Sequence, residues 1–268
     1  MSKIAVIDFG SQFTQLIARC VREMNVYSEI FSSSANFDDI SDFDAFILSG
    51  SPNSIDKKAE FKLVKDILQN NESTRKPILG ICYGLQVIAH HFGVEVHSGS
   101  QKEFGRVRLN IISESKITDG IWQVGAEPEV WMSHSDSIAN IPCGFKLVAR
   151  SVLSDAISIV ENDDRKIYGL QFHPEVTHTT DGRKLIANFV SKIAKCSSDW
   201  TIKSFLEEEI IRIQNIVGNK KVLAAVSGGV DSSVAATLIH KAIGENLHCI
   251  FIDTGLLRKD EAKCVKAS

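Results

Sequence analysis

Pro-Ile-Leu-Gly-Ile-Cys-Tyr-Gly-Leu-Gln-Val-Ile-Ala, residues 77–89, is a short apolar run in which two glycines flank a cysteine. Gly80 to Gly84 has the spacing of a nucleophile elbow, with Cys82 in the place that serine takes in many hydrolases. An elbow is a tight strand-to-helix turn whose neighbours come too close for side chains, and glycine meets that requirement. The stretch therefore predicts a strand, a tight turn and a helix, with the Cys82 thiol directed toward a substrate.

Cys82 would lie at a helix N-terminus. There the helix dipole and the free backbone N–H groups favour a thiolate over a thiol and can stabilise a developing oxyanion. A buried cysteine between two packing glycines is the alternative interpretation of an isolated motif of this kind. The choice depends on whether the chain also supplies a base and a carboxylate.

A second apolar run, residues 167–172, ends in His173-Pro174-Glu175. A cysteine nucleophile needs a base that takes its proton and returns it to the leaving amine, and the base needs a carboxylate that fixes its tautomer. His173 and Glu175 supply both, and Pro174 disfavours a helical backbone at His173. A lone histidine here would be a solvated turn residue, whereas its combination with Cys82 and Glu175 favours catalysis.

Composition excludes several classes of protein. The 268 residues carry a net charge of −3 and are 44% hydrophobic, which predicts one large domain or up to two ordinary ones. We expect no nucleic-acid partner and no membrane span, because there is no basic run and no long apolar stretch. Met1-Ser2-Lys3 leads directly into an apolar strand, so we expect no signal peptide. The six cysteines lack C-x-x-C spacing, which argues against zinc or disulfides and favours a cytoplasmic location.

The first hundred residues alternate apolar runs with helix-like segments, the pattern of a parallel sheet covered on both faces. We expect strands at 3–8, 27–31 and 45–48 and helices at 12–24 and 61–69. The third strand ends in a Ser-Gly-Ser-Pro loop that contains Gly50. Ligands bind beyond the carboxyl ends of parallel strands, so this loop is placed to face Cys82, although by itself it would be a simple turn.

Shorter runs follow, and they predict antiparallel strands at one end of the sheet. We expect these at 94–97, 105–111, 129–132 and 145–149. The polar cluster at 133–136 would be a helix cap or a turn on structural grounds alone. His90 and His91 do not face each other on a helix, so we interpret them as a helix end.

Two helices are expected next, an amphipathic one at 181–194 and another at 200–217, with Glu207-Glu208-Glu209 on a solvated face. A second α/β unit should begin after Gly218, with a buried-type strand at 221–226 and a helix at 234–243. The strand ends in Ser-Gly-Gly-Val-Asp-Ser-Ser, residues 227–233.

That loop has the chemistry of a phosphate site. Its glycines allow close approach of a phosphate, its serines add donors, and the following helix supplies N–H groups and positive dipole. The lysine of the Walker motif is absent. An ordinary strand-to-helix turn is the alternative.

Gly-Ile-Cys-Tyr-Gly-Leu-Gln and His-Pro-Glu make residues 1–196 resemble the class I glutamine amidotransferases. The resemblance implies an α/β fold with a central, mostly parallel sheet, flanking helices and a small antiparallel sheet. It implies that Cys82 attacks glutamine, His173 is the base and Glu175 orients it, with no cofactor. Oxyanion donors would be the N–H groups of Gly50 and Tyr83. Glutamine contacts would come from Gln86, Ser133, His134 and Asp136.

Ser135 departs from the related pattern Trp-Met-Ser-His-Gly-Asp, which has glycine at this place. Serine there would tighten the turn or alter how the amino and carboxylate groups of glutamine are held. The departure therefore bears on glutamine affinity.

Residues 227–233 resemble the pyrophosphate loop of the N-type ATP pyrophosphatases, which have an adenine nucleotide alpha hydrolase-like fold. The resemblance implies an ATP or pyrophosphate site made by Ser227, Gly228, Gly229, Val230, Asp231, Ser232 and Ser233. Asp231 is a candidate for organising Mg²⁺ or phosphate, and the metal ligands stay open. Residues 249–258 resemble the next segment of that family, near the nucleotide.

The order of the two halves resembles the glutamine-hydrolysing GMP synthase family. We expect an amidotransferase domain at 1–196, a linker helix at 197–219 and the first, incomplete part of an ATP pyrophosphatase domain at 220–268. The resemblance implies that the full synthetase uses glutamine, ATP, Mg²⁺ and xanthosine monophosphate, releases GMP, AMP and pyrophosphate, and forms a homodimer through a domain beyond Ser268.

We expect the 268-residue chain alone to retain glutaminase chemistry and not synthesis. Three alternatives stay open: another glutamine-dependent synthetase, a free-standing glutaminase, and a non-catalytic binding module.

Overall fold

The computed structural model describes residues 1–55, 61–253, 255, 262–263 and 265. The chain divides into two compact units, Met1–Trp200 and Thr201–Ser268. Each unit is described by itself.

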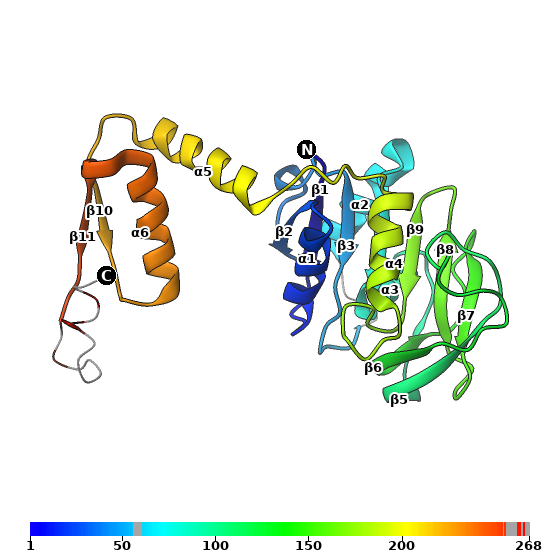
Figure 1. Ribbon diagram of the computed structural model, residues 1–268. Coiled ribbons are helices and arrows are strands. Elements are labelled where there is room, and N and C mark those ends of the chain that lie inside the picture. Colours follow the sequence, from blue (N-terminus) through cyan, green and yellow to red (C-terminus); the bar gives the residue numbers. More distant parts are fainter. Residues whose placement is uncertain (56–60, 254, 256–261, 264, 266–268) are drawn as a thin grey trace. The chain divides into compact units, whose positions relative to one another are not determined.

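A sheet with the strand order β2-β1-β3-β4-β9-β8-β7-β5-β6 organises the described residues of the first unit (Figure 1). The parallel strands are β1 (Lys3–Asp8), β2 (Tyr27–Ser32), β3 (Ala45–Leu48), β4 (Ile78–Ile81) and β9 (Ile167–Leu170). The antiparallel strands are β8 (Ile157–Asn162), β7 (Lys146–Ser151), β5 (Val96–Ile111) and β6 (Glu129–Ile138). The predicted combination of a parallel sheet with antiparallel strands at one end is confirmed.

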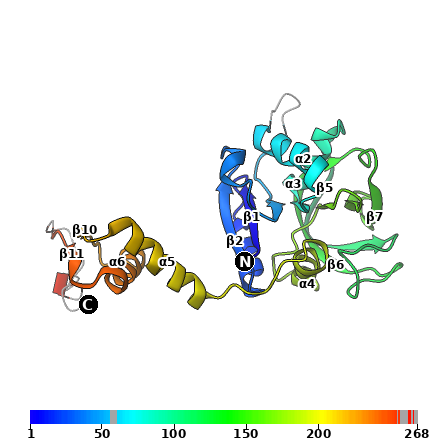
Figure 2. The ribbon, with the colours of Figure 1, turned by 90° about the horizontal axis from the view of Figure 1, so that it is seen from above.

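Helices cover both faces of the parallel strands, as the continuous apolar runs predict. Ile4 and Val6 of β1 pack in one core with α1 (Thr14–Glu23) and α4 (Gly182–Asn188). Ala5 and Ile7 of β1 point the other way, into a core with α2 (Lys62–Thr74) and α3 (Tyr83–His91). Figure 2 shows α2 and α3 on one side of the sheet and α4 on the other. The alternation of side chains along β1 thus builds two cores.

The antiparallel part corrects two expectations. The predicted strand at 105–111 and the last two residues of the one predicted at 94–97 belong to one long strand, β5, which begins at Val96. The polar cluster at 133–136, expected to be a cap or a turn, lies inside β6. Pairing explains this, because Ser133 and His134 are opposite Phe104 and Glu103 of β5, so the ladder continues through the polar residues.

The predicted helix at 181–194 is divided. It begins as α4 and continues as a π-helical segment, Phe189–Ile193. The predicted helix end at His90 and His91 is confirmed, since α3 ends at His91.

The second unit contains α5 (Ile202–Val217), β10 (Val222–Ala225), α6 (Val230–Ile243) and β11 (Leu247–Ile250), with β10 parallel to β11. Thr201 begins α5 with a capping box. The strand predicted at 221–226 is present as β10, but the expectation that it is buried is wrong, because β10 pairs only with β11 in the described residues and Leu223 is 68% exposed. Of the predicted segment 249–258, residues 254 and 256–258 lie outside the described residues.

In the part of the chain that the structure describes, every helix is too short or too polar to cross a membrane. Glu207 and Glu208 of α5 are exposed, and Glu209 pairs with Arg212 at 2.6 Å, in agreement with the predicted solvated face.

Candidate active site

Cys82 lies between β4 and α3 with φ 53° and ψ −104°, a conformation that residues with a Cβ rarely adopt. The flanking glycines are required by close packing. A Cβ on Gly84 would lie 2.4 Å from the Leu48 carbonyl oxygen, and a Cβ on Gly80 would lie 2.7 Å from the Leu85 backbone nitrogen. The tight strand-turn-helix predicted from the sequence is therefore present.

His173 follows β9 and is hydrogen-bonded through Nδ1 to the Oε1 atom of Glu175 at 2.7 Å. Both backbone polar groups of His173 are hydrogen-bonded. Its N–H donates to the Trp131 carbonyl at 3.0 Å, and its carbonyl accepts from the Thr179 hydroxyl at 2.6 Å. These bonds fix the histidine against the start of β6. Glu175 in turn fixes the ring orientation.

Burial of His173 opposes its positive charge, but the Glu175 carboxylate and the Cys82 sulfur outweigh this and raise the His173 pKa to about 10. The second oxygen of Glu175 is buried and has no hydrogen-bond partner among the described residues. The pair therefore favours a protonated imidazole beside the sulfur.

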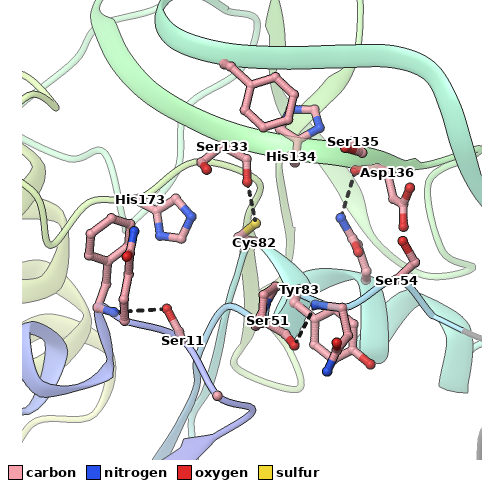
Figure 3. Close-up of a pocket in the computed structure, with 17 residues that line it drawn as sticks. Ser11, Ser51, Ser54, Cys82, Tyr83, Ser133, His134, Ser135, Asp136 and His173 are labelled. Carbon is pink, nitrogen blue, oxygen red and sulfur yellow. Dashed lines mark hydrogen bonds between the residues drawn. The ribbon is translucent and has the colours of Figure 1, made fainter.

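The Cys82 sulfur has polar neighbours on two further sides. Its thiol points to the Ser133 carbonyl at 3.9 Å, and the Gln171 side-chain Nε2 donates to the sulfur at 3.7 Å. Figure 3 shows the His173 ring and Ser133 beside the sulfur. Cys82, His173 and Glu175, which the sequence predicts as nucleophile, base and carboxylate, thus lie in one site.

Gly50 approaches the same place. A Cβ built on it would lie 3.0 Å from His173 Cε1 and 3.8 Å from Cys82 Cβ. The absence of a side chain at Gly50 therefore lets the loop after β3 pack closely against the site. Tyr83 is the first residue of α3 and directly follows Cys82. Both predicted oxyanion donors therefore belong to segments beside Cys82.

A pocket of about 420 Å³ opens over the sulfur (Figure 3). The loops after β1 and β3, the elbow, His173 and the paired strands β5 and β6 line it. The lining residues are Gly10, Ser11, Gln12, Phe13, Ser51, Pro52, Asn53, Ser54, Cys82, Tyr83, Gln86, Phe104, Ser133, His134, Ser135, Asp136 and His173. The site thus lies at the carboxyl ends of the parallel strands.

The four predicted glutamine contacts all line this pocket. Gln86 is buried on α3, and its Nε2 donates to the Asp136 carbonyl at 2.8 Å. The Oδ1 atom of Asp136 is buried and lacks a hydrogen-bond partner among the described residues. Ser133 is exposed, whereas His134 is buried.

His134 faces a carboxylate that the sequence did not reveal. Its Nε2 lies 3.3 Å from the Oε2 atom of Glu103, and the Ser151 hydroxyl donates to Oε1 of the same group. Burial opposes the charge of Glu103, but the nearby His134 ring and the hydrogen bond from the Ser151 hydroxyl outweigh it and lower the Glu103 pKa. Glu103 and His134 form a buried pair at the wall of the pocket.

Ser135 does not tighten a turn, because it lies in the extended strand β6. It is absent from the non-glycine residues with positive φ in the described chain, so the strand accepts serine without a left-handed backbone. Its side chain is exposed.

Sequence reasoning missed the loop after β1, the side chain of Gln171 and the side chain of Glu103. Phe13 in that loop packs edge-on against His173 with ring centroids 5.1 Å apart. A signal for the loop existed, since a strand followed by Gly10-Ser11 repeats the pattern of the strand followed by Gly50-Ser51. Glu103 carried no comparable signal.

The predicted pyrophosphate loop joins β10 to α6. Gly229 is the N-cap of α6, so residues 230–233 form its first turn, earlier than the helix start expected at residue 234. The Ser232 hydroxyl accepts from the Ser227 backbone N–H at 3.2 Å, and the Ser233 hydroxyl donates to the Gly229 carbonyl at 2.9 Å. Within the described residues no group of three or more His, Cys, Asp or Glu could hold a metal ion.

Comparison with protein families matches residues 5–193 to "Glutamine amidotransferase class-I" and residues 220–268 to "tRNA methyl transferase HUP domain". The chain is 56% identical over 264 residues to the glutamine-hydrolysing GMP synthase of Ehrlichia canis, covering 98% of this chain and 50% of that protein. It is 56% identical over 263 residues to the glutamine-hydrolysing GMP synthase of Wolbachia pipientis wMel, covering 97% of this chain and 50% of that protein. The chain spans about half the length of the curated relatives it matches.

Solved structures support the fold. A candidate GMP synthase subunit from Thermoplasma acidophilum aligns with a TM-score of 0.64 at 32% identity, over 78% of this chain and 98% of that one. A glutamine amido transferase from Methylobacillus flagellatus aligns with a TM-score of 0.51 at 20% identity, over 66% and 70%, and supports the fold alone. The expected fold class is confirmed. With its elbow, its buried His173–Glu175 pair and a family match over residues 5–193, the chain belongs to the class-I glutamine amidotransferase family.

Proposed function

We propose that the first unit hydrolyses the side-chain amide of glutamine with Cys82, His173 and Glu175. The observation that carries the proposal is the 2.7 Å bond between His173 and Glu175 in the pocket that contains the elbow cysteine. The raised pKa of His173 favours a protonated imidazole beside the sulfur, and a cysteine nucleophile attacks as its thiolate.

The thiolate attacks the amide carbon and the carbonyl becomes an oxyanion, which the N–H groups of Gly50 and Tyr83 stabilise. His173 then gives its proton to the leaving nitrogen, and ammonia departs from a glutamyl thioester. Water, deprotonated by His173, hydrolyses the thioester and restores Cys82. Glu175 holds the imidazole in the required orientation throughout.

Gln86, Ser133, His134 and Asp136 would hold the substrate. The partnerless buried oxygen of Asp136 supports a role in accepting the α-ammonium group of glutamine, because a buried carboxylate oxygen is costly without a partner. Gln86 fixes the Asp136 backbone through its 2.8 Å bond.

For the whole protein, we propose glutamine-dependent synthesis of GMP from xanthosine monophosphate, supported by the GMP synthase relatives. Residues 227–233 would bind the pyrophosphate part of ATP with Mg²⁺, Asp231 being a candidate to organise the metal, at the N-terminus of α6. Residues 1–196 would be the amidotransferase domain, 197–219 the linker and 220–268 the start of the ATP pyrophosphatase domain. The full protein would act as a cytoplasmic homodimer.

The test is ammonia release from glutamine by the 268-residue chain, with Cys82→Ala as the variant and Cys20→Ala as the matched control. Cys20 is a buried cysteine on α1 and is not among the residues that line the pocket. We expect Cys82→Ala to abolish release and Cys20→Ala to retain it, with no change when ATP and xanthosine monophosphate are added. Release that survives in Cys82→Ala would refute the assignment of the nucleophile.

A further inference from the structure

Gln171 is a buried polar side chain that the mechanism above does not use. It is fully buried just after β9, where its backbone N–H donates to the Ser158 carbonyl at 2.9 Å. Its side-chain amide lies between two groups of the candidate site. Nε2 donates to the Cys82 sulfur at 3.7 Å, and Oε1 accepts from Gln86 Nε2 at 3.5 Å.

The orientation of this amide is determined by its neighbours. Gln86 donates through Nε2 to the Asp136 carbonyl at 2.8 Å, which sets the direction of the Gln86 amide. The same Nε2 faces Gln171, so Gln171 must present its oxygen there and its N–H to the sulfur. The reversed amide would bring two N–H groups together and place an oxygen against the sulfur. Hydrogen bonds therefore connect the Asp136 carbonyl on β6 to the Gln86 amide on α3. They continue from Gln86 through the Gln171 amide to the Cys82 sulfur.

Cys82 is only 4% exposed, so a thiolate there receives little solvation from water. A buried charge needs hydrogen bonds from protein donors. The Ser133 carbonyl on one side can accept a hydrogen bond from the thiol, but it repels the thiolate. His173 supplies positive charge, and Gln171 supplies an N–H donor that keeps its own proton.

We propose that Gln171 is a further catalytic residue of this site, whose amide N–H stabilises the Cys82 thiolate and fixes the sulfur for attack. The inference rests on the proposed glutaminase function. In the step concerned, the thiol proton moves to Nε2 of His173, the nitrogen not bonded to Glu175, while Gln171 only donates a hydrogen bond.

The test is the pH dependence of Cys82 alkylation by iodoacetamide, followed by mass spectrometry of the Cys82 peptide, in wild type and Gln171→Met. Methionine keeps a long unbranched side chain without an N–H donor. A lost hydrogen bond to a charged group should raise the pH midpoint of alkylation by about one unit, which slows alkylation about ten-fold below the midpoint. A profile that coincides with wild type would overturn the inference.

Asn188→Leu is the matched control, since it removes a buried amide that bonds the Ile117 and Asp119 carbonyls at 3.0 and 2.9 Å, away from the pocket-lining residues. Its alkylation profile should match wild type, and an equal shift in both variants would attribute the effect to general loosening and overturn the inference. Gln171→Glu is the second variant. Glutamate keeps the shape of glutamine but can only accept hydrogen bonds when it is ionised. It should therefore raise the pH midpoint of Cys82 alkylation at least as far as Gln171→Met does.

Alkylation does not require glutamine turnover, so the two hypotheses fail separately. If wild type releases no ammonia, the proposed function fails while the alkylation profiles can still be compared. If wild type releases ammonia and Gln171→Met lowers kcat with little change in KM, the role of Gln171 is supported. Unchanged kcat and an unchanged alkylation profile would reject it.

Discussion

Replacing Cys82 by glycine should give a more stable protein than replacing it by alanine, the reverse of the usual order. Cys82 has φ 53° and ψ −104°, and such a backbone costs a residue with a Cβ about 1–3 kcal/mol. Glycine removes that cost but loses about 0.5–1 kcal/mol in conformational entropy. Both variants lack the sulfur, so its lost contacts cancel in the comparison. The free energy of unfolding should favour Cys82→Gly by about 1 kcal/mol.

Urea unfolding of the two variants measures this difference, provided that their m values agree. Ala89→Gly is the matched control, because Ala89 is buried in the helix that follows the same elbow. There the ordinary order should hold, with a loss of about 1 kcal/mol or more. Cys82→Ala at least as stable as Cys82→Gly would refute the claim of backbone strain at Cys82.

Gly84→Ala should lower the free energy of unfolding by about 3 kcal/mol, because its Cβ would lie 2.4 Å from the Leu48 carbonyl oxygen; a melting temperature equal to wild type would contradict this. The His173 pKa is raised from 6.5 to about 10, so the stability that protonated His173 contributes is fully present below pH 6.5 and is lost as the pH rises through about 10. The urea concentration at the unfolding midpoint should therefore fall between pH 6.5 and about 10, and Glu175→Gln should make this fall smaller. An equal dependence on pH in wild type and Glu175→Gln would contradict the pairing of His173 with Glu175. Thr201→Ala removes the N-cap of α5 and should cost about 1 kcal/mol, seen as faster amide exchange in its first turn, whereas unchanged exchange would count against the cap.

The elbow could be predicted because its determinants are local. Gly80 and Gly84 are required because any strand-turn-helix of this kind leaves no room for a Cβ at these positions. The apolar runs on either side predict the flanking strand and helix. His173 and Glu175 are two residues apart, so their pairing also followed from a short segment. Most of the parallel strands were predictable for the same reason, since β1, β3, β4 and β9 each contain a short continuous apolar run.

The remaining features depend on contacts between distant segments. The polar residues 133–136 have the composition of a turn, and only pairing with β5 keeps them in a strand. The meeting of Glu103 with His134 follows from that register, and the contact of Gln171 with Cys82 follows from the packing of α3 on the sheet. Exposure of Leu223 in β10 likewise depends on which strands lie beside it.

The most direct test of the central claim is labelling with 6-diazo-5-oxo-L-norleucine, an electrophilic analogue of glutamine, in the presence and absence of glutamine. We expect one label, on the peptide that contains Cys82, and we expect glutamine to slow the labelling because both compounds enter the pocket over the sulfur. Labelling of another residue, or labelling of Cys82 at a rate that glutamine does not change, would contradict a glutamine site at the elbow.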